Sequence, residues 1–143
     1  MSSMKIQHIL ETCLYVDDLN VAERFYTQVL GFPLLGQQPG RHVFLRCGSR
    51  MLLLFDPRES GQPDGDFPPH GAAGPGHVAF AVLEQDLPAW QMRLESQGVP
   101  IEKSIDWPAG GRSLYFRDPA GNSLELATPR IWGIDETTLQ SAN

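Results

Sequence analysis

The chain has 143 residues, and its 11 Lys and Arg against 17 Asp and Glu give a formal net charge of −6. This length is typical of one domain. The acidic balance argues against a nucleic-acid surface, because neutralising phosphates requires a basic face. No apolar run approaches the roughly 20 residues of a membrane span, and the first residues lack the apolar segment of a secretory signal. We therefore expect a cytoplasmic protein with two reduced cysteines, Cys13 and Cys47, in its apolar core.

The first half of the chain predicts the order β-α-β-β-β. Residues 6–16 are rich in apolar and β-forming types and predict a strand. Residues 19–30 repeat apolar positions at helical spacing, and Gly31 is placed to end that helix. Three further strands are expected over 32–35, 42–47 and 51–55, the last two forming a hairpin.

The second half repeats this order. Its strand, helix and three strands are expected over 77–83, 87–97, 99–105, 113–117 and 123–127. The junction Leu30-Gly31-Phe32-Pro33-Leu34 corresponds to Gln97-Gly98-Val99-Pro100-Ile101, which favours a true repeat over the general likeness of any two α+β halves.

These patterns predict an α+β fold made of two βαβββ modules. We expect the modules to span 6–56 and 76–128 and to form one domain over residues 5–128. Residues 57–75 are rich in proline and glycine and predict a linker or long loop. Residues 129–143 are increasingly polar and predict a tail without a clear element.

Ionisable side chains stand among small ones on one face of three predicted strands. Alternation puts Glu11, His77 and Glu125 opposite the larger apolar residues of their strands, which predicts a pocket on that face. The acids have three open interpretations, because burying a carboxylate without a partner is costly. They can lie on a solvated face, or converge with the imidazole on one cation. They can also pair with an arginine, the candidates being Arg46, Arg112 and Arg117.

Four motifs occur in an order that is specific when they are taken together. They are Val16-Asp17-Asp18-Leu19, Phe25-Tyr26-x-x-Val29-Leu30-Gly31-Phe32, Gly76-His77-Val78-Ala79-Phe80-Ala81-Val82 and Tyr115-Phe116-Arg117-Asp118-Pro119-Ala120-Gly121-Asn122-x-x-Glu125-Leu126. With them the chain resembles the vicinal oxygen chelate superfamily, which includes glyoxalase I, extradiol dioxygenases, fosfomycin-resistance enzymes and bleomycin-resistance proteins. The resemblance implies two modules whose mixed sheets curl around a central pocket, often within a homodimer.

The resemblance also implies a set of metal ligands. His77 and Glu125 match the family's histidine and glutamate, whereas Glu11 stands where the family usually has histidine. A glyoxalase-type site takes a further ligand from the last strand of the first module, where the repeat places Leu54 or Leu52. The set Glu11, His77 and Glu125 suits a divalent Mn, Fe, Zn, Ni or Mg ion. Alternatively, Glu11 is a general base beside a metal held by the other two residues, or the chain has lost the metal.

The function implied is that of a metal-dependent enzyme of the glyoxalase/dioxygenase type. Such a lyase, isomerase or oxygenase chelates two vicinal oxygens of a small molecule. Glu125 or Glu11 is the expected catalytic base. Tyr115 is expected to donate a hydrogen bond to the substrate and Arg112 to meet an anionic group, unless they are an ordinary strand tyrosine and a surface charge. The second class of function is a metal-free protein that sequesters a drug-like ligand in a dimer groove, as bleomycin-resistance proteins do.

Overall fold

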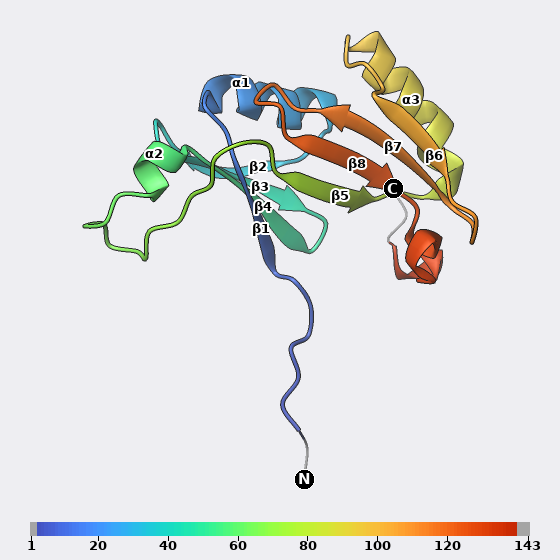
Figure 1. Cartoon of the computed structure of the whole chain (residues 1–143), viewed down its shortest axis with the longest axis horizontal. Coiled ribbons are helices and arrows are strands. Elements are labelled where there is room, and N and C mark those ends of the chain that lie inside the picture. The colour runs from blue at the N-terminus through green and yellow to red at the C-terminus, as the bar shows by residue number, and fades with distance from the viewer. Residues whose placement is uncertain (1–2, 140–143) are drawn as a thin grey trace. The chain divides into compact units, whose positions relative to one another are not determined.

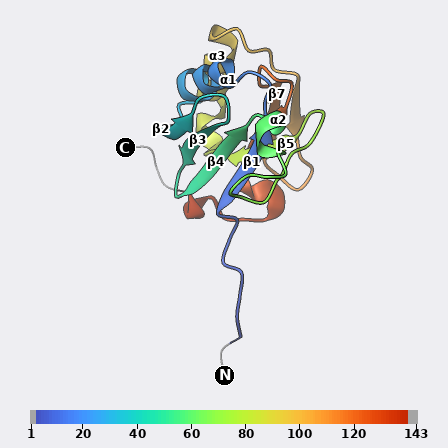
Figure 2. The ribbon, with the colours of Figure 1, turned by 90° about the vertical axis from the view of Figure 1, so that its left-hand side faces the viewer.

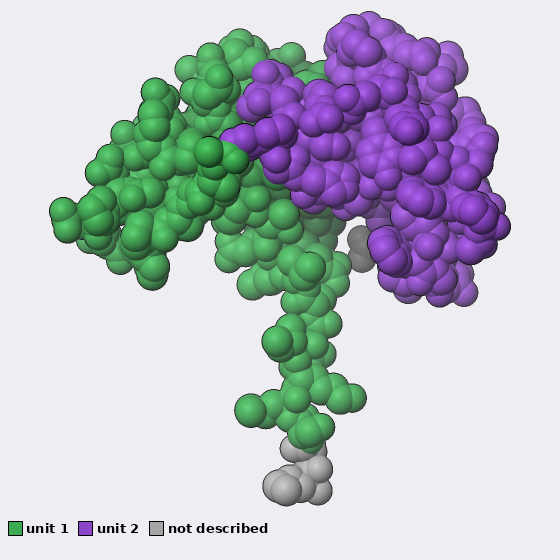
Figure 3. Space-filling view, in the orientation of Figure 1, with its two compact units in different colours: residues 1–73 green, residues 74–143 purple. Residues whose placement is uncertain are grey.

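The computed structural model describes residues 3–139. The chain forms two compact units, Met1–Ala73 and Gly74–Asn143, which are called unit 1 and unit 2 and are coloured separately in Figure 3. Each unit contains one four-stranded sheet. None of the helices within residues 3–139 has the length and apolar character that a membrane span requires.

Unit 1 is built on a sheet with the strand order β1-β4-β3-β2 (Figures 1 and 2). Its strands are β1 (Glu11–Tyr15), β2 (Leu34–Gln38), β3 (His42–Cys47) and β4 (Arg50–Phe55). β1 runs parallel to β4, and the other pairs are antiparallel. Its helical segments are α1 (Leu19–Arg24), the π-helical continuation η1 (Phe25–Val29) and the short α2 (Pro57–Ser60). The carboxylate of Asp18 caps α1 by accepting the N–H of Val21.

Unit 2 repeats the arrangement with the strand order β5-β8-β7-β6 (Figure 1). Its strands are β5 (His77–Ala81), β6 (Lys103–Asp106), β7 (Arg112–Arg117) and β8 (Ser123–Ala127). Its helical segments are η2 (Glu84–Asp86), α3 (Leu87–Ser96), η3 (Pro129–Trp132) and η4 (Glu136–Thr138). β5 runs parallel to β8, as β1 does to β4. The matching order and direction confirm the predicted α+β fold of two βαβββ modules.

Alternation along the strands separates a core face from an opposite face in each sheet. The buried residues of unit 1 include Leu14, Val43, Leu45, Leu52 and Leu54 from its strands and Phe25, Tyr26 and Val29 from its helical segment. Those of unit 2 include Phe80, Leu114, Phe116, Leu124 and Leu126 from its strands and Leu87 and Leu94 from α3. The other face of β5 carries His77, Ala79 and Ala81, all of them exposed. The face that the sequence predicts for His77 is therefore open.

The first strand is shorter than predicted. Only Glu11–Tyr15 form β1, and residues 3–10 lie outside any strand. The reason is the length of the partner strand, because β4 begins at Arg50 and the N–H of Met51 already bonds to the carbonyl oxygen of Leu10. Residues before Leu10 therefore extend beyond the end of β4.

Two other segments contain more structure than predicted. The expected linker opens with α2, because Asp56 caps its first N–H groups and Pro57 occupies the first helical turn, where its missing N–H costs nothing. The expected tail forms the two 3₁₀ turns η3 and η4. Neither segment has an apolar period, so capping residues were the only sequence signal for them.

Both cysteines are free, but the prediction that they lie in the core is wrong for Cys13, which is exposed, while Cys47 is half-buried. Cys13 alternates with the buried Leu14 along β1 and therefore lies on the opposite face. Partial desolvation raises the pKa of both thiols above the ordinary value. Both thiols are therefore protonated at neutral pH.

Asn122, in the loop between β7 and β8, fixes the start of β5. Its side-chain oxygen accepts the N–H of Gly76 at 2.7 Å, and its side-chain nitrogen donates to the carboxylate of Asp118 at 2.9 Å. The Asn122 side chain is buried. Asn122→Ala is expected to lower the free energy of unfolding by about 2–3 kcal/mol, because it leaves a part-buried N–H and a buried carboxylate oxygen without this partner. Denaturant unfolding measures the loss, and the exposed Asn20→Ala in α1 serves as the control. Equal stability of the two variants would contradict this role for Asn122.

Candidate metal site

His77, the first residue of β5, has a ring orientation set by the neighbouring strand. Its Nδ1 lies 2.9 Å from the carbonyl oxygen of Ser123, which stands opposite it on β8. This contact is a hydrogen bond when Nδ1 carries the proton, so Nε2 of the neutral ring keeps a lone pair. Nε2 lies 3.3 Å from Oε1 of Glu125, and half of the side chain, 51%, is exposed. In this tautomer the ring offers the lone pair of Nε2 to a cation that approaches from solvent.

Glu125, in the middle of β8, is a buried carboxylate whose side chain is only 7% exposed. Its Oε2 accepts a hydrogen bond from Oγ of Ser113 at 2.5 Å, and Oε1 faces His77. Arg112 and Arg117 do not neutralise it, because they pair with Asp106 at 2.6 Å and with Glu102 at 3.1 Å. Of the predicted arginine partners, the two that lie in the described part of unit 2, Arg112 and Arg117, therefore do not pair with Glu125.

Tyr115 stands directly opposite Glu125 on β7. Its ring is nearly parallel to the ring of His77, at an angle of 20° and a centroid distance of 6.3 Å. Burial raises the pKa of Tyr115 above its ordinary value, and the negative charge of Glu125 raises it further. The phenol therefore keeps its proton and can donate a hydrogen bond beside the His77–Glu125 pair.

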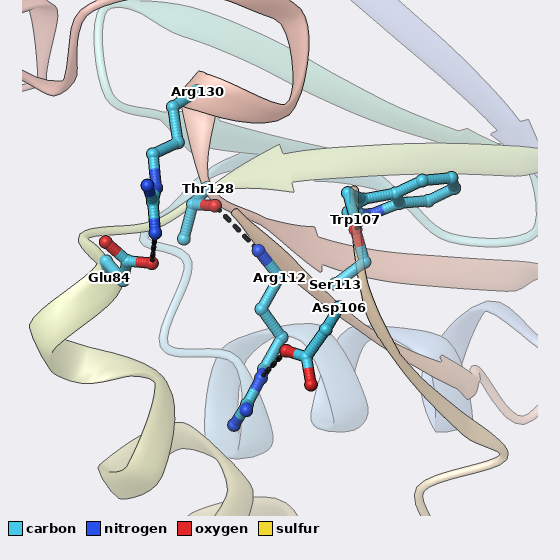
Figure 4. Close-up of polar contacts among 7 residues, drawn as sticks. All are labelled: Glu84, Asp106, Trp107, Arg112, Ser113, Thr128 and Arg130. Atoms are coloured by element: carbon cyan, nitrogen blue, oxygen red, sulfur yellow. Dashed lines mark hydrogen bonds and ion pairs between the residues drawn. The ribbon is translucent and has the colours of Figure 1, made fainter. Parts of the chain in front are cut away.

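Ser113 and Trp107 belong to the same cluster, although the sequence did not single them out as site residues. The indole Nε1 of Trp107 donates to Oγ of Ser113 at 2.9 Å (Figure 4), and this hydroxyl in turn donates to Glu125. The available signal was parity, since Ser113 alternates with Leu114 and so shares a strand face with Tyr115. A carboxylate buried in mid-strand also needs a nearby donor.

The donor set of this pair fits a divalent cation. With Nδ1 of His77 bonded to a carbonyl, two lone-pair atoms, Nε2 and Oε1 of Glu125, face each other at 3.3 Å. Neighbouring ligands at about 2.0–2.2 Å from an octahedral or tetrahedral metal lie about 2.8–3.6 Å apart. The carbonyl behind the imidazole and the hydroxyl behind the carboxylate also match the outer partners that orient metal ligands in proteins.

Glu11 holds in unit 1 the strand position that His77 holds in unit 2. Glu11 stands opposite Met51 on β4, as His77 stands opposite Ser123 on β8. Glu11 is exposed on β1. Within residues 3–139 no group of three or more His, Cys, Asp or Glu side chains is placed to hold a metal. The role of Glu11 as a third ligand therefore stays a prediction.

The position in unit 1 that corresponds to Glu125 is Leu53, and the predicted Leu54 or Leu52 is wrong by one residue. Leu53 stands opposite Cys13 on β1 and Phe44 on β3, as Glu125 stands opposite Ala79 and Tyr115. Aligning the repeat on the preceding strand gives Leu54 and aligning it on the hairpin glycine gives Leu52, and neither alignment gives the register of the strands. A leucine cannot bind a metal, so the residue at this position offers no further ligand.

Arg112 is exposed, and its guanidinium is engaged by Asp106 from the neighbouring strand β6 (Figure 4). It alternates with Ser113 along β7, so its side chain leaves the sheet on the face opposite Ser113. The predicted contact of Arg112 with an anionic group requires this ion pair to open, and it stays a prediction.

A model of the Glyoxalase/Bleomycin resistance protein/Dioxygenase superfamily matches residues 5–126. The chain belongs to this superfamily. The resemblance noted in the sequence is thereby confirmed, and the His77–Glu125 pair lies within the matched part.

Three of the proteins similar to this chain carry different names. The chain is 32% identical over 124 residues to glutathione transferase FosA of Serratia marcescens, which covers 85% of this chain and 80% of the relative. It is 39% identical to metallothiol transferase FosB of Bacillus licheniformis over 57 residues, which are 39% of this chain and 37% of the relative. A crystal structure of lactoylglutathione lyase from Agrobacterium tumefaciens is similar with 44% identity and a TM-score of 0.88, covering 92% of this chain and 100% of that chain.

Proposed function

We propose that this protein is a divalent-metal-dependent enzyme in which His77 and Glu125 hold the metal, with Glu11, named by the family resemblance, as the candidate third ligand. The observation that carries the proposal is the pair of lone-pair atoms, Nε2 of His77 and Oε1 of Glu125, that face each other at 3.3 Å with their outer partners in place. Arg112 and Arg117 do not pair with the buried carboxylate of Glu125, so a cation bound between it and His77 would stabilise its charge.

The bound metal would act as a Lewis acid that chelates two vicinal oxygens of a small molecule. The chain's own groups then position the substrate and take a proton from it. Tyr115, protonated at neutral pH, donates a hydrogen bond to a substrate oxygen next to the pair. Glu125 and Glu11 are the carboxylates able to take a proton from the substrate. Arg112 contacts an anionic group of the substrate only when its ion pair with Asp106 opens.

The substrate class that we propose contains a thiol or a thiol adduct. The names of the relatives support this choice, since they are a glutathione transferase, a metallothiol transferase and a lactoylglutathione lyase. Thiol transfer to an oxygenated electrophile and rearrangement of a thiol adduct both place neighbouring oxygens within reach of one metal. An assay panel combining glutathione and other low-molecular-weight thiols with epoxide and 2-oxoaldehyde partners distinguishes the two reactions.

Metal binding separates this function from the metal-free, ligand-sequestering alternative. Equilibrium dialysis against Mn²⁺, Fe²⁺, Zn²⁺, Ni²⁺ and Mg²⁺ is expected to load one ion per chain of the wild type. His77→Ala is expected to lower this loading sharply at the same protein and ion concentrations, and His8→Ala, in the exposed segment before β1, is expected to leave it unchanged. Failure of the wild type to retain any of these ions would favour the sequestering function.

The third ligand has its own test. Glu11→Gln preserves the shape of the side chain and removes its charge. If Glu11 binds the metal, this variant is expected to weaken metal affinity by at least about 10–100-fold, the loss typical of even outer partners of a metal site. The exposed Glu95→Gln on α3 is the control. An unchanged affinity of Glu11→Gln would reduce the protein ligands to His77 and Glu125.

A homodimer and a cytoplasmic location complete the proposal. The segment before β1 supports self-association, because its apolar residues Met4, Ile6 and Ile9 are 101%, 97% and 72% exposed. Burying such side chains against a second copy is favourable. Light scattering on the full chain and on a Met4, Ile6 and Ile9 triple serine variant tests this, with a dimer expected only for the former.

A further inference from the structure

A buried serine links an indole to the site's carboxylate. Ser113 is fully buried, with 0% of its surface exposed. Its Oγ lies 2.9 Å from Nε1 of Trp107 and 2.5 Å from Oε2 of Glu125. The three side chains form one hydrogen-bonded chain that ends on Oε2 of Glu125, whereas the other oxygen, Oε1, is the one 3.3 Å from Nε2 of His77.

The direction of these hydrogen bonds is fixed by chemistry. An indole N–H donates only, and an ionised carboxylate accepts only. The hydroxyl of Ser113 must therefore accept from Trp107 and send its single proton to Glu125. The last torsion of a glutamate side chain is intrinsically broad, so this bond selects one rotation of the carboxylate. In that rotation Oε2 is held by Ser113 and Oε1 faces Nε2 of His77 at 3.3 Å.

The turn before β7 holds the indole in place. Its backbone is closed by two hydrogen bonds, from Trp107 N–H to Gly111 oxygen at 3.0 Å and from Gly110 N–H to Trp107 oxygen at 2.9 Å. Both glycines have positive φ angles, 107° and 89°, which side-chain-bearing residues rarely adopt. Trp107 itself is 36% exposed. The indole is thus anchored by its N–H and its turn, while part of the ring remains in contact with solvent.

We infer that Ser113 and Trp107 are positioning residues that hold the carboxylate of Glu125 in the orientation required to bind a divalent cation together with His77. This inference rests on the proposed function. It assigns a role to two residues that contact neither the substrate nor the metal. It also makes Trp107 an optical reporter of the site, because its N–H is two hydrogen bonds away from the carboxylate of Glu125.

Metal affinity of matched variants tests the inference. Ser113→Ala removes the hydroxyl, and Trp107→Phe keeps an aromatic ring while removing the N–H. The Kd for Mn²⁺, measured by electron paramagnetic resonance of the free ion, is expected to rise about 10–100-fold in Ser113→Ala. A smaller rise is expected in Trp107→Phe. Ser104→Ala on β6 and Trp132→Phe in η3, both at exposed positions, are expected to bind Mn²⁺ as the wild type does.

Fluorescence supplies a readout that a purely structural role would not change. The chain has three tryptophans, so a Trp90→Phe, Trp132→Phe background leaves Trp107 as the only indole. Its emission is expected to shift on addition of Mn²⁺ and to lose that response when Ser113→Ala is added. Ser113→Thr, which retains the hydroxyl, is expected to restore the response.

The outcomes separate this inference from the proposed function. Wild-type binding of Mn²⁺ with equal Kd in folded Ser113→Ala and Trp107→Phe would overturn the positioning role and leave the metal site intact. A wild type that binds none of the divalent ions removes the proposed function, and the inference falls with it. Thermal unfolding of each variant establishes that it is folded, and the partly exposed Trp107→Phe keeps the test decisive if Ser113→Ala does not fold.

Discussion

Glu125→Gln is expected to lower metal affinity by at least about 100-fold and to abolish metal-dependent activity. Outer partners of a metal ligand typically contribute about 10–100-fold to affinity, so loss of a charged ligand has a larger effect. Glutamine preserves the shape of the side chain and can still accept from Ser113, so the change isolates the negative charge at the oxygen that faces His77. Isothermal titration with Mn²⁺ or Zn²⁺ measures the loss.

Stability distinguishes this effect from misfolding. Glu125 carries a buried charge that is costly without its cation, so Glu125→Gln is expected to leave the free energy of unfolding of the metal-free protein unchanged or raised. Glu102→Gln is the matched control, because Glu102 belongs to the same unit but pairs with Arg117 at the surface. Wild-type affinity in Glu125→Gln would show that Glu125 is not a ligand.

Gly111→Ala is expected to lower the free energy of unfolding by about 2–4 kcal/mol. A Cβ at this position would lie 2.5 Å from Cγ2 of Ile131 and 2.7 Å from Oγ1 of Thr128. Such overpacking costs about 1–3 kcal/mol, and the left-handed backbone at φ 89° adds about 1 kcal/mol. The displaced Thr128 also accepts the N–H of Arg112 at 3.0 Å (Figure 4), so the turn that carries Trp107 would shift as well.

Gly40→Ala provides the comparison for this substitution. Gly40 also has a positive φ, 78°, but a Cβ there would have nothing within 4 Å. Only the backbone cost of about 1 kcal/mol is expected in that variant. Denaturant unfolding of both variants isolates the steric part, and equal losses of stability would contradict the close approach at Gly111.

The fold was predictable because alternation, helical spacing and glycine-ended helices repeat in both halves. Leu14, Phe80, Leu124 and Leu126 lie in the core as their alternation predicts. The ends of elements were less predictable, since they depend on partner strands distant in sequence. β1 begins at Glu11 only because β4 begins at Arg50. The π-helical turn η1 likewise has no local signal, since its residues match ordinary helical spacing.

The candidate site was predictable where one residue carries the chemistry. His77 and Glu125 stand out because ionisable groups on apolar strands require an explanation. Ser113 and Trp107 could not be assigned in this way, because a serine and a turn tryptophan have many ordinary roles. Their hydrogen-bonded link to Glu125 depends on the pairing of β7 with β8. This register places Ser113 opposite Ala127, two residues from Tyr115 on the same strand. The same dependence on register placed the counterpart of Glu125 at Leu53 and not at either predicted leucine.

Pulsed electron paramagnetic resonance of the Mn²⁺-loaded protein tests most directly whether His77 and Glu125 form a metal site. The spectrum of the wild type is expected to show the ¹⁴N coupling of one imidazole bound to Mn²⁺. The coupling is expected to disappear in His77→Ala at a protein concentration high enough to retain the ion, and to persist in His8→Ala. Bound Mn²⁺ without a nitrogen coupling in the wild type, or a coupling that survives His77→Ala, would contradict the site.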